Sequence, residues 1–426
     1  MRLVPDDPPR GPFRPGFWRS PLRGPWLTSL LGSLLLVLVS VVAVTGFVSQ
    51  AAYQPGLGTN QKVPGSPGFA PFAFDWPTHP SWLYAANQGL HVTVGIVAVP
   101  LLLAKLWSVI PRLFAWPPLR SPAMAIERLS IALLVGSALF QFATGIADVQ
   151  VWYPFGFGFV TAHYYGAWVF VGSLALHVAV KLPTMRRTFA TQGVIAPLKA
   201  DLARTRPEPP DPDGLVASAP AEPTLSRRGL LGLVGGGSLL LLGVTAGQTV
   251  GGPLRATALL APRGRRTGGG ANDFQVNKTA TGSHVTPEMT GPGYRLELRG
   301  GAHAHSLSRS ELLRLELRTA DLPIACVEGW STTQRWTGVT LAELARMAGA
   351  PARATVHVES LQPAGAFREV TLSPDQVADP RSLLALHVNG ADLSVDHGFP
   401  ARLVVPALPG VHNTKWVSRL TFAAAA

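Results

Sequence analysis

The chain has only one cysteine, Cys326, among its 426 residues. A single thiol cannot form a disulfide within the chain, so cysteine pairing does not reveal the redox compartment. It also cannot build a structural zinc site without other ligands. The residue lies in the stretch IACVEGWSTTQRW, Ile324 to Trp336. Two interpretations remain: a small buried hydrophobic side chain, or a thiolate that acts as a nucleophile or a soft metal ligand.

Charged residues are also scarce, at 14%, whereas hydrophobic residues make up 47%. This balance is typical of chains with membrane spans rather than of ordinary soluble enzymes. The formal net charge is +12. The arginines cluster beside apolar runs, where the positive-inside rule places them, so we expect membrane lipid rather than nucleic acid as the partner.

Four apolar runs predict an all-α four-helix membrane domain over residues 26–182. The first, Trp26 to Val48, is free of charge and long enough to span a bilayer, and it is longer than the apolar region of a signal peptide. The others are Trp82 to Val109, Leu129 to Ile146 and Val160 to Val180. Basic residues gather in the basic tail 1–25 and in alternate connections. We therefore expect an integral protein of the cytoplasmic membrane with its N-terminus in the cytoplasm.

Two linkers and a further apolar segment follow. Residues 183–225 are rich in Pro, Ala and acidic residues, and are expected to be a cytoplasmic linker too polar and broken to pack a core. In residues 226–250, Arg227 and Arg228 precede an apolar stretch, which resembles a twin-arginine export signal. An ordinary fifth span remains open. Both interpretations place everything after Val250, including the linker 251–271, outside the cytoplasm.

Residues 272–426 change to the pattern of a mixed α+β domain of about 150 residues. YRLELRG, ATVHVES and ARLVVPAL alternate as strands do. Asn389 and Gly390 predict a hairpin turn. TLAELARMAGA predicts a short helix, and SRSELLRLEL a second helix that begins with a Ser308–Glu311 capping box.

Three blocks of this domain, in order, resemble the sulfite oxidase family of molybdopterin enzymes. CVEGWSTTQRWTGVTLAEL, which begins at Cys326, resembles the family's metal-binding segment. Upstream, FQVNKTA resembles its first pterin-contacting loop. Downstream, the segment from Leu383 to Phe422 shares the family's His-Gly, Pro, Arg and Lys-Trp-Val. The fold class is therefore expected to be multi-domain: a membrane four-helix bundle, a fifth transmembrane helix, and a C-terminal sulfite-oxidase-type molybdopterin domain.

The resemblance implies a role for each matching residue. Cys326 would bind molybdenum as the catalytic centre, while the pterin dithiolene supplies two further sulfurs. The pterin carries a phosphate, which needs cations, and Arg402 and Lys415 are the candidates. His397 would hydrogen-bond the pterin or its phosphate. The other cofactor-binding candidates are Asn277, Lys278 and Thr279. Solvated surface charges and a structural histidine remain the alternatives for these groups, and Trp330 and Trp336 are expected in the core.

Three histidines lie within the apolar runs, His91, His163 and His177. An ionisable residue inside a span is a functional hypothesis by default. Fourteen residues separate His163 from His177, which on a helix gives about 21 Å of rise with both side chains within about 40° of one face. This arrangement resembles membrane cytochromes b that exchange electrons with quinones, which implies haem b with axial imidazoles.

Two haems would need four histidines, so at most one complete haem is expected. By depth, His91 with His163 is the closer pair. A quinone-binding histidine, or a polar contact with Gln141 or Tyr164, remains the alternative.

Together these patterns predict a membrane-anchored oxidoreductase with its molybdopterin domain on the extracytoplasmic side. The resemblance implies oxygen-atom transfer on a small-molecule oxide or oxyanion, with electrons exchanged with the quinone pool through haem b. Reduction of an S- or N-oxide is favoured, and sulfite oxidation is the alternative. A catalytically silent binding module on a membrane anchor, or a cytochrome whose soluble domain only docks a partner, would be different classes. The presence of Cys326, Arg402 and Lys415 argues against the silent module.

Overall fold

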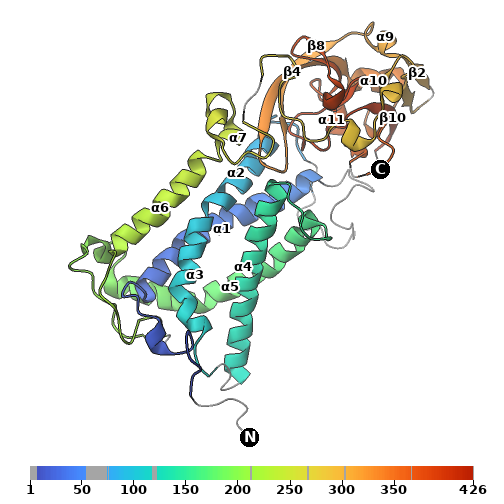
Figure 1. Cartoon of the computed structure of the whole chain (residues 1–426). Helices are drawn as coiled ribbons and strands as arrows, with labels where there is room; N and C mark the ends of the chain where they lie inside the picture. The colour runs from blue at the N-terminus through green and yellow to red at the C-terminus, as the bar shows by residue number, and fades with distance from the viewer. Residues whose placement is uncertain are drawn as a thin grey trace. The chain divides into compact units, whose positions relative to one another are not determined.

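The computed structural model describes residues 7–53, 74, 76–117, 122–211, 214–265, 268–301, 304–365 and 367–425. It divides into two compact units (Figure 1). The helical unit comprises Met1–Ala43, Val94–Asp148 and Tyr153–Gly243. The sheet unit comprises Val44–Thr93, Val149–Trp152 and Val244–Ala426. The sheet unit therefore includes parts of the apolar helices as well as the C-terminal domain.

Five helical segments in the described residues are long and apolar enough to cross a membrane, which is compatible with a membrane protein. They overlap the five predicted apolar segments. The helices that form them are α1 (Pro25–Tyr53), α2 (Leu83–Val97), α3 (Val99–Leu113), α4 (Pro122–Val149), α5 (Phe159–Gln192), α6 (Arg227–Gly243) and α7 (Gly247–Val250). A closed bundle of four of them stays a prediction.

The predicted linker 183–225 is partly folded, which corrects the expectation that it packs no core. α5 continues to Gln192, and a 3-10 helix, η3, covers Ala196–Lys199. Glu208 is buried, and its carboxylate accepts hydrogen bonds from Trp26 N at 2.8 Å and Leu27 N at 3.4 Å. A carboxylate at this place satisfies free N–H groups of α1 and complements its dipole. The acidic composition of the segment therefore serves a structural contact.

Arg227, the first of the paired arginines, is part of the same contact. Its side chain is buried, with Nη2 4.0 Å from the Glu208 carboxylate and 3.0 Å from Arg206 O. Leu230 and Leu231 of α6 pack against a core of α1 and α3 that includes Leu27 and Leu101. In the folded chain this arginine is an internal partner of Glu208.

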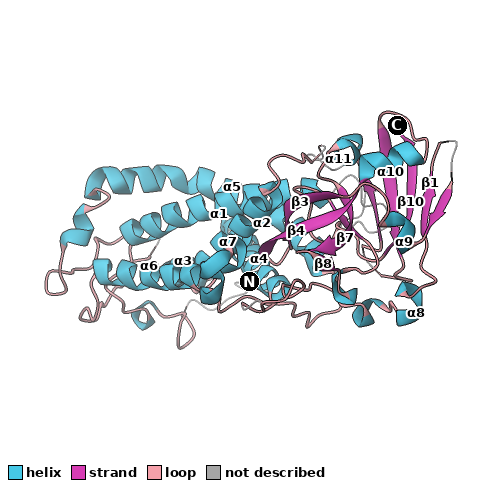
Figure 2. Cartoon of the chain, turned by 90° about the horizontal axis from the view of Figure 1, so that it is seen from above, coloured by secondary structure: helices cyan, strands magenta, loops and turns pink. Residues whose placement is uncertain are grey.

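The C-terminal domain has two sheets, and all the described strands belong to it (Figure 2). The first has the order β2-β1-β10-β5-β6, and the second the order β3-β4-β7-β8, with β9 paired to β7. The strands are β1 (Leu296–Arg299), β2 (His305–Leu307), β3 (Arg318–Ala325), β4 (Ser331–Thr340), β5 (Ala354–Ser360), β6 (Glu369–Leu372), β7 (Leu383–Val388), β8 (Ala391–Asp392), β9 (Arg402–Val404) and β10 (Val417–Ala424). The α+β expectation is confirmed.

Local signals explain most of these elements. Asn389 and Gly390 both have positive φ, 50° and 84°, and join β7 to β8 as predicted. The helix expected in TLAELARMAGA is α10 (Leu341–Met347). The Ser308–Glu311 capping box is present, but α9 (Arg309–Leu312) is a single turn, so the longer helix predicted in SRSELLRLEL is wrong. β3 begins soon afterwards and takes the chain into the sheet. α8 (Pro287–Thr290) and α11 (Pro374–Ala378) are also short.

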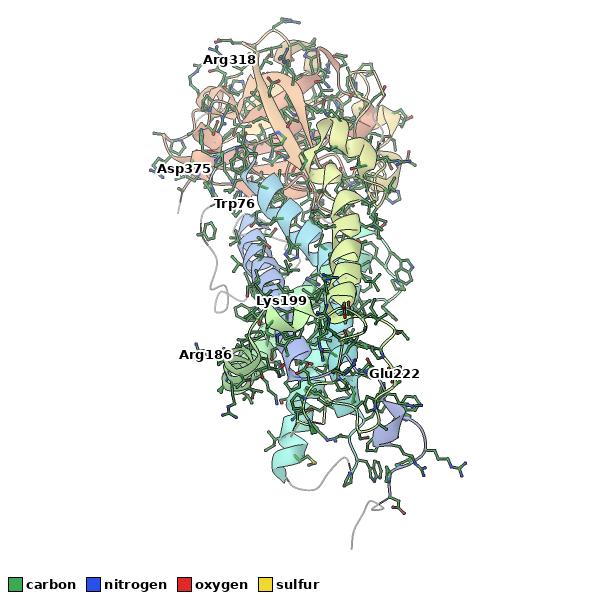
Figure 3. All side chains as sticks on the ribbon, turned by 90° about the vertical axis from the view of Figure 1, so that its left-hand side faces the viewer. Trp76, Arg186, Lys199, Glu222, Arg318 and Asp375 are labelled. Atoms are coloured by element: carbon green, nitrogen blue, oxygen red, sulfur yellow. The ribbon has the colours of Figure 1, made fainter. Side chains whose placement is uncertain are left out.

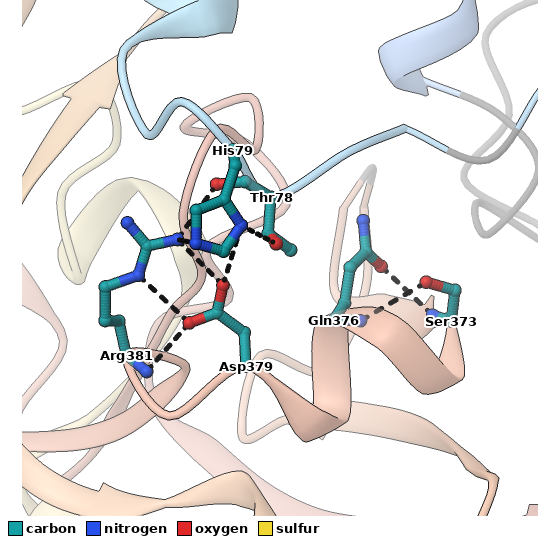
Figure 4. A network of polar contacts seen from close by, with 6 residues as sticks. All are labelled: Thr78, His79, Ser373, Gln376, Asp379 and Arg381. Atoms are coloured by element: carbon teal, nitrogen blue, oxygen red, sulfur yellow. Dashed lines mark hydrogen bonds and ion pairs between the residues drawn. The ribbon is translucent and has the colours of Figure 1, made fainter.

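Residues 76–81, just before α2, pack on the C-terminal domain within the sheet unit. Trp76, labelled in Figure 3, donates from Nε1 to Ala407 O at 2.7 Å. Arg381 donates to Thr78 O at 3.2 Å and contacts His79 at 2.8 Å. The same arginine pairs with the buried Asp379 carboxylate at 2.8 Å (Figure 4). The start of α2 is thereby fixed to the domain by several independent contacts.

The Glu208 contact gives a stability prediction. Glu208→Ala removes the acceptor of two backbone N–H groups and the ion-pair partner of the buried Arg227, so we expect a loss of about 3 kcal/mol in the free energy of unfolding. Thermal or denaturant unfolding of the full chain in detergent measures it. Arg204→Ala, which removes only an exposed ion pair with Asp201, is the matched control and should change little. Equal stability of the two variants would contradict the structural role of Glu208.

Candidate functional site

Cys326 lies in the tight turn of the β3–β4 hairpin, whose last paired residues are Ala325 and Ser331. We call residues 326–330 the Cys326 turn. Cys326 N donates to Trp330 O, and Gly329 N donates to Cys326 O, both at 3.0 Å. Gly329 has φ of +89°, a conformation that favours glycine. The turn therefore holds the thiol at one defined place at the end of two long paired strands.

The Cys326 side chain is buried in a cluster that includes Ile324, Trp330 and Trp336. Burial, with a smaller contribution from Glu328, raises the pKa of the thiol to about 12. A metal that binds there must therefore displace a proton. No group of three or more His, Cys, Asp or Glu side chains within the described ranges is placed to hold a metal ion. A metal at Cys326 would take its other ligands from a cofactor.

Four residues predicted to bind the cofactor come together, and we call Lys278, His397, Arg402 and Lys415 the anion cradle. Lys415 Nζ donates to the carbonyl oxygens of Lys278 and Asp396, both at 2.7 Å. Arg402 Nη1 donates to His397 O at 3.2 Å. The Cβ atoms of Arg402 and Lys415 both pack close to Gly398. Lys278 is far from the other three in the sequence, whereas His397, Arg402 and Lys415 lie close together in it.

Two cations of the cradle are buried. Burial lowers the pKa of the Arg402 guanidinium to about 9. Burial lowers the pKa of Lys415 well below its ordinary value, and the nearby Arg402 adds to this, while Asp396 and Cys326 oppose it. The Arg402 Nε is buried and has no hydrogen-bond partner among the described residues. An unpaired buried donor in a cluster of positive charge fits an anionic group that would pair with it.

His397 is buried and neutral in this environment. Its Nε2 lies 2.9 Å from Asn272 O, so Nε2 carries the proton and Nδ1 is an acceptor. Nδ1 is buried without a partner in the part of the chain that the structure describes. Phe274 stacks on the ring at 3.7 Å between centroids. Burial, followed by the charges of Arg402 and Lys415, lowers the pKa of His397 to about 4. Such an acceptor suits an N–H donor of a ligand better than a phosphate.

The remaining predicted loop residues are less involved. Lys278 Nζ donates to Gln362 Oε1 at 2.8 Å, and burial lowers its pKa. Asn277 is half-buried. Thr279 is exposed, and its hydroxyl accepts the Gly282 N–H within its own turn at 3.1 Å. Lys278 therefore takes part in the cradle through its backbone carbonyl, whereas the Thr279 side chain is engaged in a local turn.

Several residues of the site carry no sequence signal. Arg263 binds the buried Glu328 carboxylate through two nitrogens, at 2.8 and 3.1 Å, and Trp330 Nε1 donates to the same carboxylate at 2.7 Å. Asn272 and Phe274 contact His397. Arg263, Asn272 and Phe274 find these partners far away in the chain. The burial of the two tryptophans was predicted: Trp330 and Trp336 are 2% and 0% exposed.

Two of the three histidines in the apolar helices have matching surroundings. His91 Nδ1 lies 3.3 Å from the Thr45 hydroxyl, and His163 Nδ1 lies 3.0 Å from the Thr144 hydroxyl. Each threonine precedes a glycine. A Cβ added at Gly46 would lie 2.8 Å from His91 Cε1, and one at Gly145 would lie 3.2 Å from His163 Cε1. In known metal sites, a hydrogen bond at one ring nitrogen of a histidine orients the other nitrogen towards the metal.

His177 makes no comparable contact within the described residues. His91 belongs to the sheet unit, and His163 and His177 belong to the helical unit. Their pairing around one haem therefore stays a prediction.

The lowered pKa of His397 predicts an acid-dependent stability. Below pH 6.5 the unfolded histidine takes up a proton, while the folded one stays neutral down to about pH 4. The free energy of unfolding of protein made without cofactor should therefore fall over this window by up to about 3 kcal/mol. Unfolding measured at several pH values tests this. His397→Gln should flatten the dependence, and His284→Asn, at an exposed site, should keep it. Identical slopes for wild type and His397→Gln would refute it.

A family model matches the part of the chain that carries the Cys326 turn and three residues of the cradle, His397, Arg402 and Lys415. Residues 283–426 match the model of the oxidoreductase molybdopterin binding domain. Mitochondrial sulfite oxidase of Rattus norvegicus is 31% identical over 170 residues, which are 33% of this chain and 31% of that protein.

Two other similar proteins are named as reductases. The protein-methionine-sulfoxide reductase catalytic subunit MsrP of Xanthomonas campestris is 32% identical over 130 residues, 28% of this chain and 40% of that protein. Nitrate reductase [NADH] 1 of Phaseolus vulgaris is 35% identical over 106 residues, 22% of this chain and 12% of that protein. The chain spans less than half the length of each. The C-terminal part of the chain is an oxidoreductase molybdopterin-binding domain of the sulfite oxidase type.

Proposed function

We propose that the chain is a membrane-anchored molybdopterin oxidoreductase that reduces an S- or N-oxide with electrons from a quinol, passed through a haem b. The observation that carries the proposal is the buried Cys326 thiol in the same domain as a buried cationic cradle with an unpaired Arg402 Nε. The match of residues 283–426 to a molybdopterin-binding oxidoreductase domain supports the molybdopterin part of this proposal.

When bound, the molybdenum cofactor supplies oxygen-atom transfer coupled to a two-electron change. Cys326, once deprotonated, would be the protein's ligand to the metal. Arg402 and Lys415 would pair with the anionic part of the cofactor, which removes the cost of burying their charges. His397 would accept a hydrogen bond from a pterin N–H. Trp330 and the other apolar neighbours of Cys326 would exclude water from the reacting atoms.

The overall reaction balances with a quinol as reductant. The S=O or N–O bond of the substrate breaks, and the oxygen leaves as water. The quinol gives up two electrons and two protons and becomes a quinone. The relatives are named for sulfoxide reduction, sulfite oxidation and nitrate reduction. This type of domain therefore occurs both in proteins named as oxidases and in proteins named as reductases. Five apolar helices would give access to a membrane-soluble quinol, which is the donor that reduction needs.

The membrane part of the proposal rests on the helices and the histidines. The matched threonine and glycine contacts of His91 and His163 favour these two as haem ligands over His177. The basic residues favour a cytoplasmic N-terminus, with the molybdopterin domain on the extracytoplasmic side. Buried Arg227 favours residues 226–250 as a permanent span over a twin-arginine signal.

The direction of the reaction is tested by haem spectroscopy on the purified full-length chain. A short-chain quinol should produce a reduced haem b band. A sulfoxide or an N-oxide should then reoxidise that haem within the turnover time, while sulfite added to the oxidised protein should leave it oxidised. Reduction of the haem by sulfite would instead identify the sulfite-oxidising alternative.

Histidine variants serve as internal controls for this experiment. His91→Ala and His163→Ala should each lose most of the haem band, whereas His177→Ala should keep it. A haem band that survives in both His91→Ala and His163→Ala would reject this ligand pair. Absence of the haem band in wild type, from cells competent to make haem, would reject the haem route.

A further inference from the structure

The carbonyl groups of the Cys326 turn and of the strand after it are held by side chains of α2, α7 and the 3-10 helix η4 (Gly252–Thr257). Gln88 Nε2 donates to Val327 O at 2.6 Å. Gln248 Nε2 donates to Glu328 O at 3.3 Å, and Thr249 Oγ1 donates to Gly329 O at 2.5 Å. Arg255 donates to Ser331 O. All these residues belong to the sheet unit.

Gln88 is the member of this set on α2, and both the nitrogen and the oxygen of its side-chain amide are hydrogen-bonded. Its side chain is buried, and its Oε1 accepts the Ser49 hydroxyl of α1 at 2.6 Å. Gly329 also packs on α2: a Cβ added there would lie 2.8 Å from Val92 Cβ. The glycine thus allows the turn that carries Cys326 to approach the helix closely, at a point beside the Gln88 hydrogen bond.

His91 lies one helical turn beyond Gln88 on the same helix. Three residues correspond to about 4.5 Å of helix rise. α1 and α2 are joined around this histidine by the Thr45–His91 contact and by Asn87 Nδ2, which donates to Thr45 O at 2.9 Å. A short connected route therefore runs from Cys326 to Val327, across the hydrogen bond to Gln88, and along α2 to His91.

We propose that Gln88 is a positioning residue for electron transfer, which couples the Cys326 turn to the helix that carries His91. The inference rests on the proposed function, because it takes His91 to be a haem ligand. Gln88 would hold the peptide next to Cys326 at a fixed distance from the haem. Gln248 holds the neighbouring peptide from α7, a helix that does not carry His91, and so separates anchoring of the turn from coupling to the haem.

The structure also indicates that loss of Gln88 would leave the domain in place. Four other contacts to the C-terminal domain do not involve Gln88. Trp76 and the Thr78 carbonyl contact Ala407 and Arg381 of the domain. Thr249 and Arg255 contact Gly329 and Ser331. A variant at this position should therefore remain folded and retain both molybdenum and haem.

The test compares Gln88→Leu with Gln248→Leu in the full-length chain. The first readouts are molybdenum content, haem content and turnover with a soluble reduced viologen dye, which does not need the haem. Both variants should match wild type in these. The second readout is the rate at which a sulfoxide reoxidises the pre-reduced haem. We expect it to fall by about tenfold in Gln88→Leu and to stay within about twofold in Gln248→Leu.

Hydrogen exchange of residues 326–331 provides a readout that does not depend on activity. Both variants should raise exchange in this segment, because each removes one of its anchors. Equal slowing of haem reoxidation in both variants would assign the effect to general loosening and overturn the proposal, as would an unchanged rate in Gln88→Leu. Wild-type protein with dye-driven turnover but no haem would instead reject the haem route of the proposed function, and the inference with it.

Discussion

The structure depends on positive charge that is buried beside Cys326 without an equal amount of negative charge. Arg402 and Lys415 are held inside the C-terminal domain, and their main hydrogen-bond partners there are backbone carbonyls. Burial on this scale disfavours the charged forms, as their lowered pKa values express. Such an arrangement is stable when an anion completes it. The neutral His397, with its free acceptor nitrogen, adds a second requirement that a cofactor with N–H donors would meet.

The second constraint is the attachment of the Cys326 turn to the helices. Side chains of α2, α7 and η4 hold successive carbonyl groups of the turn and its following strand. α2 and α7 lie in different parts of the sequence, and both reach the same turn. Helices long and apolar enough to cross a membrane thereby contribute directly to the surroundings of the candidate catalytic thiol.

The sequence was sufficient where the signal is local. The five apolar runs, the Asn389–Gly390 turn and the Ser308–Glu311 capping box each depend on residues close together in the chain. The three matching blocks also brought Cys326, Arg402 and Lys415 into one domain. The sequence was insufficient where a side chain finds its partner far away: Glu208 with Trp26, Arg263 with Glu328, and Gln88 with Val327. The linker composition was misleading because a single buried carboxylate can anchor a segment that is otherwise polar.

Metal analysis of the purified full-length chain tests the central claim most directly, with a visible spectrum of the same sample. Protein from cells that make both cofactors should contain about one molybdenum per chain together with a haem b band. Cys326→Ala should lose the molybdenum and keep the haem. Protein with neither cofactor, or molybdenum that Cys326→Ala retains in full, would contradict the account and favour a silent binding domain or a different metal ligand.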